Sequence, residues 1–363
     1  MSEIRDNLPK PTIGITMGDP AGIGPEVVVK ALKEKRIRSL ARFVVYGLNE
    51  ILAYAADLVE VEPYWFRVPH DSPRTTRRIN ENVVVLDFDE FDGFIQSPRR
   101  PSKAAGAASK AFVEEAVADA MRPPENSRHL DAIVTGPINK QAWQMAGFRW
   151  RGHTDLLASR TRARRHAMMF VSPRLKVVLA TAHIPLMEIR NVLTIGRVFD
   201  PIDLGWEACR EMGIENPSIA VTGLNPHAGE GGVLGDEETR LITPAIDAAR
   251  EAGIDVHGPF PADTVFIDAA AGKWDLVVAM YHDQGLIPVK LLGWDKAVNY
   301  TLGLPIIRTS PDHGTAFDIA GRNAASAGSM TAAIELAATL AANRMSAANA
   351  ARAAAAKRSE PAA

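Results

Sequence analysis

The sequence has little of several features on which whole classes of proteins depend. Its 363 residues include a single cysteine, Cys209, so an internal disulfide framework and a cysteine-based metal site are both excluded. The net charge is −2, which leaves no basic surplus of the kind that marks proteins binding nucleic acid or anionic membranes. No apolar run approaches the roughly 20 residues of a membrane-spanning helix. We therefore expect neither nucleic acid nor a membrane as a partner.

The rest of the composition is that of a folded globular protein. Hydrophobic residues make up 47% and charged residues 23%, and the length suggests two domains or one large α/β unit. The opening residues Met-Ser-Glu-Ile-Arg-Asp contain no apolar core of a secretory signal. A cytoplasmic protein is the simplest interpretation.

Short apolar runs alternate with turns and helical patterns, which predicts an α/β fold with buried parallel strands. An antiparallel hairpin is expected over 168–186. The polar region 63–80 is expected to be irregular, and 258–264 is expected to form a rigid turn. A closing helix is predicted from Ser329 to Met345, followed by an Ala-rich tail that we expect to fray. Strands are expected at 12–17, 42–47, 82–87, 131–137, 218–224 and 275–280.

The most informative stretch runs from Asp275 to Arg308. An apolar strand there is followed directly by the polar segment Tyr-His-Asp-Gln-Gly (281–285). This segment is a candidate site, because ligands of open α/β sheets bind beyond the carboxyl ends of strands. Lys290, Asn299 and Arg308 follow in apolar surroundings, so they are expected to be largely buried. Buried cations need a partner, and a phosphate or carboxylate ligand would serve. Pairing of Lys290 and Arg308 with Asp or Glu side chains is the alternative.

Three histidines occupy equivalent positions in the pattern. His183, His227 and His282 each lie just past an apolar strand. If the three strand ends converge, the imidazoles would bind a divalent metal and leave positions open for a substrate. Their separations are long and unlike those of H-E-x-x-H, so separate structural roles remain open.

Two turns that precede expected helices hold further candidates. The first, Gly18–Gly24, follows a strand and is a possible anion cradle. Its spacing matches neither G-x-G-x-x-G nor a P-loop, so a tight packing turn beside a cleft is an equal alternative. The second turn is Gly-His-Thr-Asp (152–155). Thr154 is explained if it caps a helix, and Asp155 is explained if its charge stabilises the first turn of that helix. Neither explanation accounts for His153.

These motifs occur together in one enzyme family. Over about residues 11 to 345 the chain resembles the 4-hydroxythreonine-4-phosphate dehydrogenase family of vitamin B6 biosynthesis. Asp155 departs from the pattern, because many members have Glu there. The matching motifs are Gly-Asp-Pro-Ala-Gly-Ile-Gly-Pro-Glu (18–26), Val-Thr-Gly-Pro (134–137) with Lys140, Gly-His-Thr-Asp (152–155), Thr-Ala-His-Ile-Pro-Leu (181–186), Leu-Asn-Pro-His-Ala-Gly-Glu-Gly-Gly (224–232), Pro-Ala-Asp-Thr (261–264), Tyr-His-Asp-Gln-Gly (281–285) and Asn-Tyr-Thr-Leu-Gly-Leu-Pro-Ile-Ile-Arg (299–308).

The resemblance implies a site for a divalent cation (Zn, Mg or Co) and a small phosphorylated hydroxy acid. His183, His227 and His282 would hold the metal and, with Lys290, would be the catalytic residues. Asp263 would be a neighbour of the metal. The family further implies a homodimer whose active site is shared between the subunits. Substrate contacts would come from His153, Thr154, Lys290, Asn299 and Arg308.

The resemblance also implies a fold like that of isocitrate and isopropylmalate dehydrogenases, with two α/β domains and a cleft between them. We expect one domain from 11–137 with 302–345 on the cofactor side, a second at 138–301 on the metal and dimer side, and a flexible tail at 346–363. The loop 312–321 looks like the adenosine-binding loop of those dehydrogenases. NAD or NADP would therefore contact His313, Gly314, Thr315 and Asp318.

The implied reaction is a metal-dependent oxidation of 4-phosphooxy-L-threonine by NAD or NADP. Its product, 2-amino-3-oxo-4-phosphooxybutanoate, would decarboxylate to 3-amino-2-oxopropyl phosphate. Lys290 would hold the phosphate or act as an acid or base. Two alternatives lie within the family: a dehydrogenase of 4-phospho-D-threonate or D-erythronate, and one of a terephthalate cis-dihydrodiol. A metabolite-binding module without catalysis is the alternative from another class.

Overall fold

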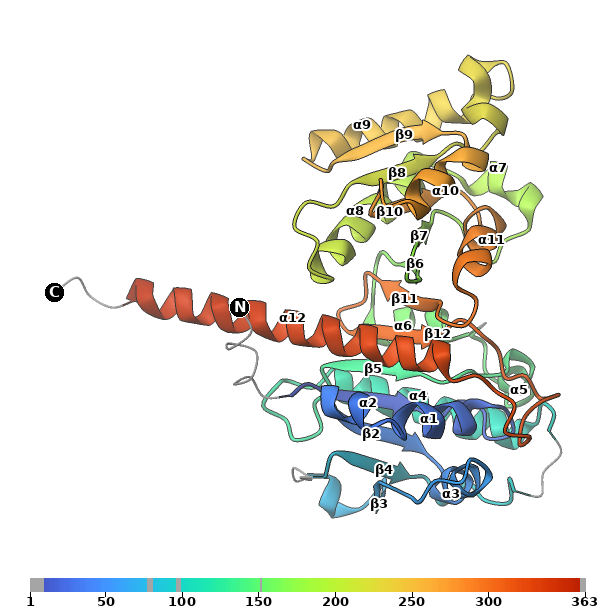
Figure 1. Cartoon of the computed structure of the whole chain (residues 1–363), viewed down its shortest axis with the longest axis vertical. Helices are drawn as coiled ribbons and strands as arrows, with labels where there is room; N and C mark the ends of the chain where they lie inside the picture. Colours follow the sequence, from blue (N-terminus) through green and yellow to red (C-terminus); the bar gives the residue numbers. More distant parts are fainter. Residues whose placement is uncertain (1–9, 77–80, 96–98, 151, 360–363) are drawn as a thin grey trace. The chain divides into compact units, whose positions relative to one another are not determined.

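The computed structural model describes residues 10–76, 81–95, 99–150 and 152–359. The chain divides into two compact units. The first unit comprises Met1–Leu156, Ile306–Thr309 and His313–Ala363, and the second comprises Leu157–Pro305 and Ser310–Asp312. Each unit is an α/β structure, which confirms the predicted fold class (Figure 1). Across the described part of the chain, no helix combines the length and the apolar character needed to cross a membrane.

The sheet of the first unit is parallel, in the order β3-β4-β2-β1-β5-β12. Helix α4 packs on β1, β2 and β5, and α12 packs on β5. Because helices cover the central strands, β1 is buried along nearly its whole length. The strands are β1 (Thr12–Thr16), β2 (Arg42–Gly47), β3 (Phe66–Pro69), β4 (Val83–Asp87), β5 (Ala132–Thr135) and β12 (Ile307–Pro311), and the helices are α1 (Gly24–Leu32), α2 (Lys35–Leu40), α3 (Asn49–Leu58), the 3-10 turn η2 (Pro73–Thr76), α4 (Lys103–Ala120), α5 (Lys140–Met145) and α12 (Gly328–Ser359).

The sheet of the second unit follows the order β11-β6-β7-β10-β8-β9. Strands β11, β6 and β7 pair antiparallel, which includes the predicted hairpin, whereas β7, β10, β8 and β9 are parallel. The strands are β6 (Ala167–Val171), β7 (Lys176–Leu179), β8 (Ile219–Thr222), β9 (Val256–Phe260), β10 (Leu276–Ala279) and β11 (Val298–Leu302). The helical segments are α6 (His153–Thr161), which begins in the first unit, η3 (Leu186–Glu188), α7 (Ile189–Val192), α8 (Ile195–Glu211), η4 (Pro226–Gly232), the π-helical turn η5 (Glu238–Ile242), α9 (Thr243–Glu251), α10 (Ala262–Ala270) and α11 (His282–Gly293).

Close packing between α8 and β10 forms part of the second unit's core. A Cβ on Gly205 of α8 would lie 2.4 Å from Leu276 Cδ2, so the Leu276 side chain packs into the space that the missing Cβ leaves. Cys209, one turn further along α8, is fully buried, and burial raises the pKa of its thiol to about 12. On β7 and β10, the apolar core includes Val177, Leu179, Val277 and Ala279.

Three local expectations were wrong. Region 63–80 contains β3, an edge strand in which only Val68 is buried, so no apolar run marks it. The segment expected to be a rigid turn contains the end of β9 and the start of α10. The closing helix α12 does not end at Met345 but continues to Ser359 (Figure 1). Alanine has the highest helix propensity, so this stretch stays helical although 346–355 are largely exposed. The division into a cofactor domain and a metal domain stays a prediction.

Candidate active site

Three neighbouring parallel strands of the second unit each lead to one predicted metal ligand. Strand β10 lies between β7 and β8 in the sheet. His183 follows β7, His282 follows β10 and His227 follows β8. The carboxyl ends of parallel strands meet at one edge of a sheet, which is where α/β proteins bind ligands.

His183 and His282 lie side by side at this edge. Their ring centroids are 5.6 Å apart and their planes are tilted by 39°. Two imidazoles bound to one tetrahedral ion, each at about 2.0–2.1 Å, place their ring centres roughly 5 Å apart, so this pair fits a shared metal. Asp283 Oδ1 lies 2.7 Å from His282 Nδ1. A carboxylate in that position favours a proton on Nδ1 and leaves the Nε2 lone pair for a metal.

Hydrogen bonds directly join the segment that links β7 to His183 with the segment that links β10 to His282. Thr181 donates its backbone N–H (3.2 Å) and its hydroxyl (2.7 Å) to the carbonyl of Met280. His183 itself has a positive φ of 51°, a backbone conformation that residues other than glycine rarely adopt. Such backbone conformations cluster at functional sites, which agrees with a ligand role for His183.

His227 lies on η4, a turn of unusual backbone conformation. His227, Ala228 and Glu230 have φ values of 52°, 52° and 46°, and the intervening Gly229 is also left-handed. Within the described residues of this chain, no group of three or more His, Cys, Asp or Glu side chains is arranged to hold a metal ion. The structure therefore brings His183 and His282 together and does not add His227 as the third member of a group.

Two side chains to which the sequence analysis gave no individual role support these histidine segments. Gln284 accepts hydrogen bonds from Met280 N and Thr222 Oγ1 (2.7 Å each) and donates to the carbonyl of Gly223 (2.8 Å). It thereby ties the end of β8 to the end of β10. Glu238, buried on η5, accepts hydrogen bonds from the residues that lead into η4. Gln284 belongs to the predicted Tyr-His-Asp-Gln-Gly motif (281–285), whereas no motif identified Glu238 as part of a site.

Lys290 and Asn299, both predicted to contact substrate, also lie in the second unit. Lys290 Nζ on α11 is 2.6 Å from Asp312 Oδ2 and 5.0 Å from the centre of the Trp294 ring. The alternative that Lys290 pairs with an acidic side chain is therefore what the structure has. Asn299 lies on β11, and its Oδ1 atom is enclosed without a hydrogen-bond partner in the described part of the chain. An enclosed amide oxygen without a donor is available to a ligand group.

Arg308 and His153 belong to the first unit. Arg308 on β12 is 3% exposed and donates Nε (3.1 Å) and Nη2 (2.7 Å) to Thr135 Oγ1 at the end of β5. Burial lowers the pKa of Arg308 to about 9, so it remains a cation at pH 7. His153 as a whole is half-buried, but its Nε2 is enclosed and has no partner among the described residues. Burial and then Arg308 hold the pKa of His153 well below its usual value.

Thr154 follows His153 in the first turn of α6. A helix start that carries a buried neutral imidazole and lies close to a buried guanidinium suits an anionic or hydroxylated ligand, because both groups offer hydrogen bonds. The electrostatic effect of Arg308 on His153 indicates that the two predicted contacts are near each other. Of the predicted substrate residues of the first unit, the structure thus places His153 near Arg308, and Thr154 follows His153 along the chain.

The predicted cofactor loop packs against the Gly18–Gly24 turn. The carbonyl of Thr315 accepts a hydrogen bond from Ile23 N (2.9 Å), and a Cβ on Gly22 would lie 2.9 Å from that same oxygen. Of the two interpretations of this turn, tight packing therefore fits the structure. The loop also holds His313, whose Nδ1 lies 3.1 Å from the carbonyl of Gly314, and the exposed Asp318.

Asp19, in the Gly18–Gly24 turn, is fully buried. Its Oδ1 accepts a hydrogen bond from Ala21 N (2.9 Å), while its Oδ2 has no partner among the described residues. Burial raises the pKa of this carboxyl to about 6. A buried acid so close to the predicted cofactor loop is a feature that the turn's spacing did not reveal.

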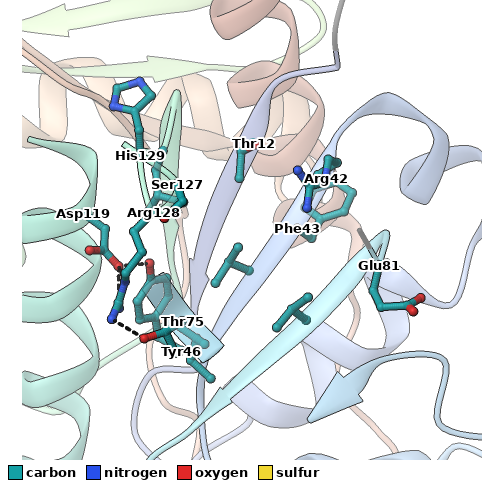
Figure 2. A pocket seen from close by; sticks show the side chains of 14 residues that line it. Thr12, Arg42, Phe43, Tyr46, Thr75, Glu81, Asp119, Ser127, Arg128 and His129 are labelled. Carbon is teal, nitrogen blue, oxygen red and sulfur yellow. Dashed lines mark hydrogen bonds and ion pairs between the residues drawn. The ribbon is translucent and has the colours of Figure 1, made fainter. Parts of the chain in front are cut away.

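A separate, partly open pocket lies in the first unit (Figure 2). Arg128 points toward Asp119 and Tyr46 at its side, where Asp119 Oδ2 accepts hydrogen bonds from Tyr46 Oη and Arg128 Nη2 (2.7 Å each). None of the residues predicted for the active site lines this pocket. Its lining is Thr12, Arg42, Phe43, Val44, Tyr46, Thr75, Glu81, Val84, Leu86, Asp119, Ser127, Arg128, His129 and Leu130.

Comparison with known proteins identifies the family. The family model described as "Pyridoxal phosphate biosynthetic protein PdxA" matches residues 39–337. The chain belongs to this family. The prediction made from the motifs is thereby confirmed, as is the prediction that the protein is an oxidoreductase.

Similar proteins within the family carry different names. A 4-hydroxythreonine-4-phosphate dehydrogenase of Desulfosudis oleivorans is 47% identical over 91% of this chain and 96% of its own length. A D-threonate 4-phosphate dehydrogenase of Salmonella typhimurium is 42% identical over 91% of this chain and 99% of its own. The solved structure of a 4-hydroxythreonine-4-phosphate dehydrogenase from Klebsiella pneumoniae is 41% identical, with a TM-score of 0.78 over 92% of this chain and 100% of its own. That of a terephthalate 1,2-cis-dihydrodiol dehydrogenase from Burkholderia xenovorans is 28% identical, with a TM-score of 0.63 over 91% and 98%.

Proposed function

We propose that this enzyme oxidises 4-phosphooxy-L-threonine with NAD or NADP and so supplies the pathway to pyridoxal phosphate. The observation that carries the proposal is the His183–His282 pair at the carboxyl ends of β7 and β10, in a family whose 47% identical member is named for this substrate. The product, 2-amino-3-oxo-4-phosphooxybutanoate, is a β-keto acid and loses CO₂ to give 3-amino-2-oxopropyl phosphate. We place the enzyme in the cytoplasm, where the substrate and cofactor are found.

His183, His282 and a third imidazole from His227 would hold a divalent cation, Zn, Mg or Co. Such an ion supplies Lewis-acid polarisation of the hydroxyl that is oxidised. The chain's own contribution is to orient the two imidazoles, through the Thr181–Met280 hydrogen bonds and the Asp283 carboxylate, before any ligand arrives.

Arg308 and Lys290 would bind the anionic groups of the substrate. Arg308 is held rigidly by Thr135, and a buried guanidinium gains most from an anion that it can contact with two donors. Lys290 would exchange part of its ion pair with Asp312 for a substrate oxygen. Asn299 Oδ1 would accept a hydrogen bond from a substrate donor, and Thr154 would supply a hydroxyl. His153, which is neutral at pH 7, would exchange hydrogen bonds with the substrate without adding charge.

His313, Gly314, Thr315 and Asp318 would bind the cofactor. The support is the rigid packing of this loop on the Gly18–Gly24 turn, which fixes the backbone near Thr315. A loop whose backbone is fixed in advance loses little conformational entropy when a dinucleotide binds.

A homodimer with a shared active site completes the proposal. Strongly exposed apolar side chains occur on α10 and at the end of α11 in the second unit, where Ile267, Leu291 and Trp294 are 69%, 80% and 72% exposed. Exposed apolar side chains of this size are typical of surfaces that a partner covers. Helix α11 also carries His282 and Lys290, so a second copy covering it would lie next to the site.

To test the proposal, the reduction of NAD and of NADP is measured in separate assays with purified protein and 4-phosphooxy-L-threonine. Reduction that stops with a chelator and returns with Zn, Mg or Co supports the proposal. The second candidate is 4-phospho-D-threonate oxidation, favoured by the 42% identical relative of Salmonella typhimurium. It is assayed in parallel, together with the terephthalate dihydrodiol. Turnover of either parallel substrate in place of the first would reassign the substrate and retain the chemistry.

A further inference from the structure

The turn that carries His227 has a backbone conformation that its own residues do not favour. Five consecutive residues, from His227 to Gly231, have φ between 46° and 82°, and three of them are not glycine. Side chains crowd the following carbonyl oxygen in this left-handed conformation, so L-residues adopt it singly and seldom in succession. Surrounding contacts must therefore hold the turn in place.

Glu238 makes the contacts that suit this purpose. It is 4% exposed, and its Oε1 accepts hydrogen bonds from Leu224 N (2.7 Å) and Asn225 N (2.8 Å), the two residues that lead into the turn. Its Oε2 accepts from Asn225 Nδ2 (3.0 Å). A Cβ on Gly229 would lie 2.6 Å from that oxygen, so the carboxylate also packs against the turn itself.

The element that carries Glu238 is unusual as well. Glu238 begins η5, a π-helical turn, and π-helical turns are frequent at functional sites. A buried carboxylate is stable only with several hydrogen-bond donors, and Glu238 has three from Leu224 and Asn225, on the approach to His227. On the other side of Asn225, Gln284 ties Thr222 and Gly223 to the strand end before His282.

We propose that Glu238 is the positioning residue that holds His227 in the conformation required for metal binding. The inference rests on the proposed function, because it takes His227 to be a ligand. Glu238 touches neither metal nor substrate in this role. It fixes the left-handed turn relative to the end of β8, and Gln284 fixes that strand end relative to His282.

The experiment compares wild-type protein with Glu238→Gln, Glu238→Ala, His227→Ala and Asp247→Asn. Asp247 is the matched control, because it is a carboxylate of the same unit that makes only an exposed ion pair with Arg250. Hydrogen exchange of 223–232 is measured on metal-free protein, and Co²⁺ is then titrated while its visible absorption is recorded. Loss of a residue that orients a metal ligand typically weakens binding about 10- to 100-fold. We expect Glu238→Ala to bind Co²⁺ about 10- to 100-fold more weakly than wild type and to have a changed Co²⁺ spectrum. Glu238→Gln should lose less affinity. Hydrogen exchange of 223–232 should be faster in both variants.

The possible failures are distinguishable. Wild-type Co²⁺ affinity and spectrum in both Glu238 variants, with faster exchange alone, would overturn the proposal and leave Glu238 a purely structural residue. No Co²⁺ binding by wild-type protein, or unchanged binding by His227→Ala, would overturn the proposed function and this inference with it. If Glu238→Ala fails to fold, Glu238→Gln carries the decision, because it keeps the volume and one acceptor oxygen.

Discussion

Lys290 Nζ lies 2.6 Å from Asp312 Oδ2, and Asp312 is the first residue of the predicted cofactor loop 312–321. A group expected to bind substrate is therefore anchored to the residue from which the cofactor loop starts. The ion pair is partly exposed, with side-chain exposures of 34% and 17%, so an incoming anion can compete for the ammonium group. The motif placed Asp312 in the cofactor loop, and the structure adds its contact with Lys290, which the motif did not indicate.

Replacing Lys290 by alanine is expected to lower kcat/KM for the phosphorylated substrate about 10- to 100-fold, because a hydrogen bond to a charged group contributes roughly 1.5–3 kcal/mol. Asp312→Asn should have a smaller effect, mainly on KM, because Lys290 keeps its charge and loses its anchor. Steady-state kinetics check both. The control is Asp268→Asn, which removes a carboxylate from an exposed pair with Lys273 and should leave the kinetics unchanged. Equal kinetics in wild type and Lys290→Ala would remove Lys290 from the site.

His183→Ala is expected to remove metal binding and nearly all turnover, since one of two adjacent imidazoles is lost. Metal content by atomic emission and activity after metal addition are the measurements. His257→Ala is the control, because His257 is a surface residue beside Asp255 in the same unit. Full activity with stoichiometric metal in His183→Ala would contradict the assignment.

Asp19→Asn is expected to raise the free energy of unfolding at pH 8. Burial raises the pKa of Asp19 from 3.8 to about 6, so the folded state binds more protons than the unfolded state between these values. Ionised Asp19 therefore destabilises the fold above pH 6, by about 3 kcal/mol at most, and this cost disappears as the pH falls through 6 to below 4. Denaturant unfolding at pH 8 and pH 4 should show a gain only at pH 8. A gain of equal size at both values would show that ionisation is not its cause.

Leu291→Asp is expected to convert dimers into monomers and to lower activity, because a charge is placed on the exposed apolar surface of α11. Sedimentation velocity reports the association state, and circular dichroism checks that the fold survives. Met121→Asp, which alters an exposed methionine of the first unit, should change neither. Monomers that retain full activity would argue against a shared active site.

Strands in the middle of each sheet were predictable because burial on both faces leaves a continuous apolar run, as in β1 and β10. The edge strands β3 and β9 were not, because few of their residues are buried and proline and glycine interrupt them. Helix α12 was underestimated because its outer half has no apolar stripe, and alanine propensity alone extends it.

Within the site, the residues that follow strands were predictable, because a polar group after an apolar run has few structural explanations. His183 and His282 are examples, and the structure brings them together. Glu238 was not predictable, because it lies outside every motif and its partner Leu224 is 14 residues away. Gln284 and Asp312 lie within predicted motifs, but their contacts with Gly223 and Lys290, 61 and 22 residues away, are encoded by no local pattern. His227 shows a further limit, since its conformation depends on contacts outside its own turn.

The burial of Cys209 makes this protein convenient for spectroscopy. Its thiol is the chain's only one, and its raised pKa and full burial keep it from reacting with maleimides in the folded state. A cysteine introduced at Ala350, on the exposed outer half of α12, would accept a single fluorophore or spin label per subunit. A helix rises about 1.5 Å per residue, so moving the labelled position along this segment shifts the label by known steps. Distances between the labels on the two copies would then report how the copies are arranged in the proposed dimer.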